Sequence, residues 1–143
     1  MSEALARKST ARTVLAVIAG LLTVVALDLS VDAVMHAKGV FPPLGTPMSD
    51  KQSLLAISYR LLDGIIGGYV AAWLAPNRPL RHAVILGSIG TLVALVGAMA
   101  TWNMNLGPHW YALAIAVAAL PAAAFGGMVR ERQRSGNSSA ERA

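Results

Sequence analysis

The sequence contains no cysteine and few charged residues. The absence of cysteine excludes disulfide bonds, thiolate metal ligands and cysteine nucleophiles together. Only 13% of the 143 residues are charged and 6% are aromatic, whereas 55% are hydrophobic. A soluble domain carries roughly 25% charged residues. The composition therefore excludes an ordinary soluble globular protein and indicates a membrane protein.

The net charge of +5 does not indicate a nucleic-acid-binding protein. Its basic residues gather at the ends of apolar runs and do not alternate with aromatic residues, as they do in single-strand binding grooves. Basic residues beside apolar segments meet anionic lipid and set membrane topology. We therefore expect the lipid bilayer, and no nucleic acid, as a partner.

Four apolar segments dominate the chain, at about residues 13–37, 52–75, 80–102 and 108–129. At 1.5 Å per residue, each is long enough as a helix to cross a hydrocarbon core of about 30 Å. The predicted fold is all-α: a polytopic bundle of four transmembrane helices in a single membrane domain, residues 1–129. Residues 130–143 are polar and rich in serine and arginine, and this composition predicts a disordered basic tail.

The first apolar segment has a second interpretation, as a cleaved signal peptide. A basic leader precedes it, and Val-Asp-Ala at residues 31–33 is a tolerable cleavage site. Apolar character resumes after Asp28, however, and ionisable residues in helical register are not needed in a discarded peptide. We therefore expect a membrane span.

Lysine and arginine residues are unevenly distributed around the four segments. Nine of the twelve lie in the leader, in the turn around residues 76–81 and in the tail. Only Lys38 and Lys51 lie in the other connections, and Arg60 lies inside a span. Cytoplasmic loops carry the excess of positive charge, so the sequence predicts that both termini are cytoplasmic.

A stripe of ionisable residues interrupts the first segment. Asp28, Asp32 and His36 recur at every fourth position, so they share one face of a helix. An acid near the middle of a bilayer costs about 2.5–3.5 kcal/mol on insertion scales, so such residues face the interior of a bundle. The antiparallel second segment brings Arg60 and Asp63 to similar depths. The sequence therefore predicts a polar intramembrane pocket of these five residues, open to the outer side.

The first functional interpretation of this pocket is a binding site for a cation or proton, as in a small transporter or channel. Three acids against one arginine leave negative charge that burial or a bound cation must neutralise. If the ligand is a metal, Asp28, Asp32 and His36 are the candidate ligands, and the metal is unknown. The Asp-x-x-x-Asp spacing resembles the metal-site helix of cation diffusion facilitators over five residues. An anion held by Arg60 is a variant of this interpretation.

Two other interpretations remain open. In the first, Arg60 and one aspartate form only an interhelical ion pair, in a structural or assembly protein. In the second, the acids and His36 act as acid and base in an intramembrane enzyme. The enzyme interpretation is weaker because the sequence contains no Gly-x-Ser-x-Gly, His-Glu-x-x-His or phosphate-loop motif. We expect no cofactor other than a possible bound cation.

Glycines in the second and fourth segments predict close helix packing. Small residues allow the backbones of two membrane helices to approach each other. The candidate packing residues are Gly64, Gly67, Gly68, Gly126 and Gly127. Because a chain this small leaves such faces to spare, we also expect a homo-oligomer.

Four stretches of the sequence are similar to a family of small four-span bacterial membrane proteins described as hypothetical proteins. These stretches are GVFPPLGTPMSD, YRLLDGIIGGY, LAPNRPLRHAVILG and GPHWYALAIAVAALPAAAFGG, within residues 40–127. The resemblance implies the four-span topology and a bacterial cytoplasmic membrane. It implies no activity, because none is established for that family.

Overall fold

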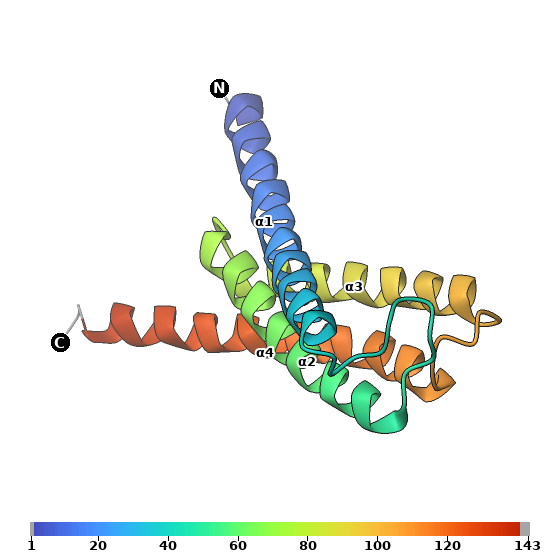
Figure 1. Cartoon of the computed structure of the whole chain (residues 1–143). Coiled ribbons are helices and arrows are strands. Elements are labelled where there is room, and N and C mark those ends of the chain that lie inside the picture. The colour runs from blue at the N-terminus through green and yellow to red at the C-terminus, as the bar shows by residue number, and fades with distance from the viewer. Residues whose placement is uncertain (1, 141–143) are drawn as a thin grey trace.

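The computed structural model describes residues 2–140, and all of the regular secondary structure in that range is α-helical. Figure 1 shows the four helices, α1 (Ser2–Ala37), α2 (Asp50–Leu74), α3 (Pro79–Thr101) and α4 (His109–Ala140). Each contains a stretch long and apolar enough to cross a membrane. The predicted fold class, a four-helix multi-pass membrane bundle, is confirmed.

Local sequence signals set the start of α2 and α3. At α2, the Ser49 side chain accepts a hydrogen bond from the Gln52 backbone N–H, and the Gln52 side chain accepts one from the Ser49 N–H. This reciprocal capping satisfies two donors that the first turn of a helix leaves free. At α3, Pro79 occupies the first helical turn, where its missing N–H costs nothing.

Both ends of the described chain are helical, which differs from the prediction for the tail. The leader is helical, because α1 begins at Ser2 and runs without a break into the span Thr10–Ala37. The expected disordered tail is also helical up to Ala140, and residues 141–143 lie outside the described part. Arginine, glutamate and glutamine favour helix, and a hydrogen bond of 2.9 Å from the Tyr69 hydroxyl to Gln133 Oε1 ties this extension of α4 to α2.

The helices alternate in direction, so the bundle has two distinct ends. We call the end with both termini and the turn at residues 75–78 the termini end, and the end with loops 38–49 and 102–108 the loop end. α4 packs on α2 and α3, and α1 packs on α2 and more weakly on α3. Within the described range, α1 makes no contact with α4. α1 is therefore held mainly by α2.

Glycine packing concentrates toward the termini end. A Cβ atom on Gly20 of α1 would lie 2.7 Å from the Gly67 carbonyl oxygen, and one on Gly68 would overlap the Ala123 backbone of α4. Gly126 approaches the backbone of α2 near Ile65 in the same way. Only glycine fits at such contacts. Gly64 and Gly127 lie against alanine side chains of neighbouring helices, so all five glycines expected at helix contacts lie at them.

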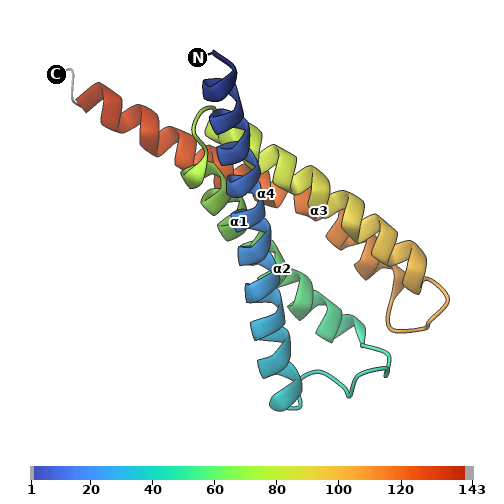
Figure 2. The ribbon, with the colours of Figure 1, turned by 90° about the horizontal axis from the view of Figure 1, so that it is seen from above.

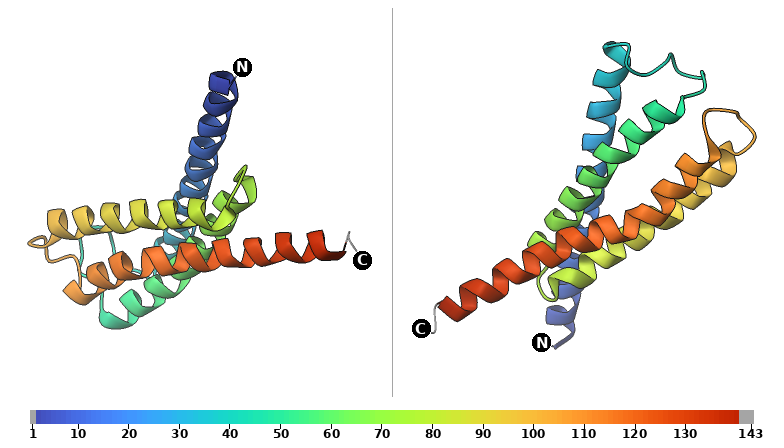
Figure 3. Two further views of the ribbon diagram at one scale, coloured as in Figure 1. Left: turned by 180° about the vertical axis from the view of Figure 1, so that it is seen from behind. Right: turned by 90° about the horizontal axis from the view of Figure 1, so that it is seen from below.

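The loop end is more open. Figures 2 and 3 show α1 diverging from the α3–α4 hairpin toward this end. The start of α2 is tied to the hairpin by a bond of 2.9 Å from the Met48 N–H to the Leu106 carbonyl and one of 2.7 Å from Trp110 Nε1 to Asp50 Oδ1. The loop between α1 and α2 turns at Gly39 and Gly45, whose φ angles of 70° and 85° favour glycine. It therefore spans the gap between α1 and the other helices.

Candidate functional site

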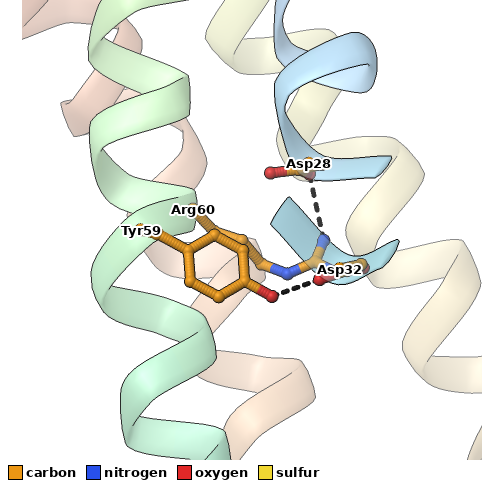
Figure 4. Close-up of polar contacts among 4 residues, drawn as sticks. All are labelled: Asp28, Asp32, Tyr59 and Arg60. Carbon is orange, nitrogen blue, oxygen red and sulfur yellow. Dashed lines mark hydrogen bonds and ion pairs between the residues drawn. The ribbon is translucent and has the colours of Figure 1, made fainter. Parts of the chain in front are cut away.

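Arg60 of α2 is the centre of a polar cluster in the half of the bundle nearer the loop end. Its Nη1 atom donates to Asp28 Oδ2 at 3.0 Å, and its Nη2 atom donates to Asp32 Oδ2 at 2.6 Å (Figure 4). The two aspartates are one helical turn apart on α1, and this spacing matches the fork of the guanidinium group. The three side chains are 21–27% exposed. One arginine thus joins α1 to α2 through two ion pairs.

Two tyrosines complete the surroundings of the arginine. The Tyr59 hydroxyl donates to the second carboxylate oxygen of Asp32, and the guanidinium carbon of Arg60 lies 5.8 Å from the centre of the Tyr59 ring. Tyr111 of α4 lies close enough to Arg60 for the two side chains to interact electrostatically. The cluster therefore contacts three helices, although only α1 and α2 supply its charges.

Asp63 adds a third carboxyl group beside Asp28. Its residue is 5% exposed, on the next turn of α2 after Arg60. The carboxyl groups of Asp28 and Asp63 lie within hydrogen-bonding range of each other. Oδ1 of Asp28 and Oδ2 of Asp63 are buried and have no conventional donor as a partner. Asp28 and Asp63 therefore form a carboxyl pair, with one oxygen of Asp28 held by Arg60.

His36 lies apart from this cluster, which corrects the predicted five-residue pocket. Its ring contacts the edge of Phe41 at a centroid distance of 5.6 Å, and Phe41, buried in the loop after α1, also lies against Tyr59. The cause is the end of α1 at Ala37, after which the chain turns back and places an aromatic ring beside His36. The structure brings together the other four, Asp28, Asp32, Arg60 and Asp63.

The described residues contain no group of three or more histidine, cysteine, aspartate or glutamate side chains arranged to hold a metal ion. Asp28 and Asp32 point their oxygens at the Arg60 guanidinium group, and His36 packs on Phe41. A fixed positive charge occupies the place between the two carboxylates that a metal ion would need. The geometry thus gives no support to the metal variant of the site.

A cleft of about 280 Å³ begins at the cluster and runs between the helices toward the termini end. Asp28 and Arg60 are the charged residues among its lining; the rest are aliphatic side chains and glycines from all four helices. The lining residues Val25 of α1 and Val93 of α3 are 44% and 64% exposed. The cleft is therefore open between α1 and α3, where these helices diverge. At its other end Leu86, 3% exposed, packs with Val17 and Ala71 and closes it.

Tyr59 and Tyr111 were not among the predicted site residues. Tyr59 had a usable signal, because it precedes Arg60 and lies at the depth of Asp32 on an antiparallel helix. Tyr111 follows Trp110 at the start of the fourth span and fits an interfacial aromatic belt equally well. Only the packing of α4 on α2 distinguishes these two roles for Tyr111.

The chain matches no protein-family model, no curated protein and no solved structure. The similarity to small four-span bacterial proteins therefore remains a prediction. The interpretation of the site depends on the geometry of the cluster and the cleft.

Proposed function

We propose that this membrane protein binds a proton at the Asp28–Asp63 carboxyl pair and works as a small proton-coupled transporter. The observation that carries the proposal is that two neighbouring carboxyl groups each have a buried oxygen, Oδ1 of Asp28 and Oδ2 of Asp63, with no hydrogen-bond donor as a partner. A single proton shared between the two groups satisfies both oxygens at once.

The energetic argument starts from charge. Two carboxylates in contact at a buried site do not both ionise readily, because their repulsion is poorly screened there. Arg60 offers limited relief, since its two terminal nitrogens already bond Asp28 and Asp32. With one proton on the pair, three aspartates and one arginine carry a net charge of −1; without it the net charge is −2. The pair is therefore the place in the cluster where a proton is gained or lost.

A structural role is the second candidate, and a separate observation favours it. The two ion pairs of Arg60 join α1 to α2, and within the described residues α1 packs on α2 and α3 but makes no contact with α4. In this candidate function the cluster fixes α1 in the bundle, and the Asp28–Asp63 pair binds no exchangeable proton. The two candidates differ in one measurable quantity, the number of protons exchanged.

Proton counting tests the proposal. The purified full chain is moved from pH 9 to pH 5 in weakly buffered detergent solution, and a pH indicator reports the protons taken up. Wild type is compared with Asp63→Asn, which removes one member of the pair. Asp50→Asn is the matched control, since Asp50 lies outside the cluster and bonds Trp110.

We expect wild type to take up about one proton more than Asp63→Asn between pH 9 and pH 5. Asp50→Asn should keep this additional proton, because Asp50 lies outside the carboxyl pair. Equal uptake by wild type and Asp63→Asn, with both proteins folded, would contradict proton binding and leave the structural role.

The membrane, its orientation and the assembly state belong to the same proposal. We propose a bacterial cytoplasmic membrane with both termini inside, supported by the concentration of lysine and arginine at the termini end. This orientation directs the cluster toward the outer side. A homo-oligomer is supported by the many exposed large apolar side chains, although lipid alone also covers such a surface. Crosslinking in native membranes that yields only monomer would contradict the oligomer.

A further inference from the structure

The cleft between α1 and α3 has the shape and polarity of a site for a small molecule. Its volume of about 280 Å³ is near the lower limit for small-molecule pockets. Its walls are apolar, and its polar groups lie together at one end. We propose that the cleft binds an amphiphilic cation, whose charged group replaces the proton of the Asp28–Asp63 pair. This inference rests on the proposed function, because it names the class of substrate exchanged for that proton.

The net negative charge of the cluster favours a ligand with a positive charge. Asp28 lines the cleft and has a buried oxygen, Oδ1, that Arg60 does not bind. The cluster keeps a net charge of −1 when the pair holds one proton. When that proton leaves and a monovalent cation binds beside Asp28, the total returns to −1. The exchange thus conserves charge in a region where uncompensated charge is costly.

The other titratable groups near the pair do not duplicate this role. Asp32 of α1 is bonded by Arg60 and Tyr59, and the two terminal nitrogens of Arg60 bond Asp28 and Asp32. Tyr111 is the titratable group that α4 contributes, and the cleft lining from α3 contains none. The carboxyl pair is therefore the one group in the cleft lining and its contacts that is left to exchange a proton for a cation.

The opening of the cleft favours a ligand that dissolves in the bilayer. Val25 and Val93 flank the opening and are exposed on spans that lie within the membrane. The floor consists of small residues, among them Gly87 and Gly90 of α3 and Ala119 of α4. A ligand entering between α1 and α3 thus meets apolar surface first and the carboxyl pair last. This order suits a molecule with an apolar body and one positive charge.

Binding of hexyltrimethylphosphonium to the purified full chain tests the inference, with hexyltrifluoroborate as a probe of similar shape and opposite charge. Calorimetry at pH 8 in two buffers of different ionisation enthalpy reports both binding and the protons released. Asp63→Asn removes one member of the pair. Gly90→Leu fills the cleft, because a Cβ at Gly90 meets only Ala119, at an ordinary 3.4 Å. Gly97→Leu is its control, about two turns further along α3, where a Cβ would meet nothing within 4 Å.

We expect saturable binding of the phosphonium by wild type and Gly97→Leu, with about one proton released per cation. Binding should weaken at least tenfold in Gly90→Leu, and proton release should disappear in Asp63→Asn. Equal binding of the phosphonium and the borate, or equal binding by both glycine variants, would overturn the inference. If wild type takes up one proton more than Asp63→Asn but binds neither probe, the proposed cation site is wrong and the proton site stands. If the proton count fails, the proposed function fails first.

Discussion

The two ends of the bundle are held together by different kinds of contact. Toward the termini end, backbones meet directly, at Gly20 with Gly67 and at Gly68 with Ala123. Toward the loop end, α1 and the α3–α4 hairpin diverge, and polar side chains connect the helices. The cleft lies between these two regions: it begins at the charged residues and runs toward the closely packed glycines.

The difference indicates how a small membrane protein stays stable although it contains buried charged groups. Apolar contact between membrane helices gains little from the hydrophobic effect, so close backbone packing must supply the stability. The glycine contacts supply it at one end, and the other end accommodates three carboxyl groups and an arginine. We therefore regard the termini end as the scaffold and the loop end as the site.

The largest expected effect comes from breaking the scaffold. In Gly68→Leu the new side chain would occupy the position of the Ala123 backbone, so α2 and α4 must separate. We expect a loss of stability on the order of 3 kcal/mol or failure to fold. Gly97→Leu makes the same change where a Cβ has open space. Size-exclusion profiles and thermal unfolding of the two variants measure the contrast, and equal stability would show that the packing contact is not limiting.

A smaller effect should follow from removing the central charge of the site. Arg60→Met leaves Asp28 and Asp32 without their partner, and an uncompensated buried charge costs about 3 kcal/mol. Partial exposure of the cluster should reduce this loss. Arg81→Met removes an exposed arginine at the termini end and should cost less than about 0.5 kcal/mol. Unfolding in mixed micelles gives both values. Equal losses of unfolding free energy in Arg60→Met and Arg81→Met would mean that Arg60 does not hold α1 in the bundle.

The smallest effects are expected from substitutions of two tyrosines of α2, one in each region. Tyr59→Phe removes a part-buried hydrogen bond to Asp32 and should cost about 1 kcal/mol. Tyr69→Phe removes an exposed hydrogen bond to Gln133 and should lower the free energy of unfolding by only a few tenths of a kcal/mol. Chemical unfolding of the matched pair resolves the difference. A larger loss at Tyr69 would reverse the assignment of the polar site to the loop end.

Much of this arrangement is readable from the sequence, for physical reasons. Hydropathy predicts the spans because a bilayer requires about 20 apolar residues per helix. The four-residue spacing of Asp28 and Asp32 predicts a shared face, and the antiparallel hairpin predicts that Arg60 meets it. These inferences depend on the geometry of one helix or of two helices adjacent in sequence.

The remaining features depend on contacts that sequence spacing does not encode. Tyr111 reaches Arg60 only because α4 packs on α2, and the cleft exists because α1 diverges from α3. His36 continues the stripe in sequence but lies where α1 ends, so local turn geometry decides its partner. The helical tail follows from the Tyr69–Gln133 contact as well as from composition.

Carbon-13 NMR of aspartate carboxyl groups tests the central claim most directly, because the chain contains only four aspartates. The full chain, labelled at aspartate and held in lipid bilayers, is titrated through neutral pH, with Asp50 as the internal reference. We predict that the Asp28 and Asp63 signals shift together as one proton leaves the pair, and that Asp63→Asn removes this shared transition. Four carboxylate signals at neutral pH, unchanged among the remaining three in Asp63→Asn, would contradict a proton site and leave Arg60 with a structural ion pair.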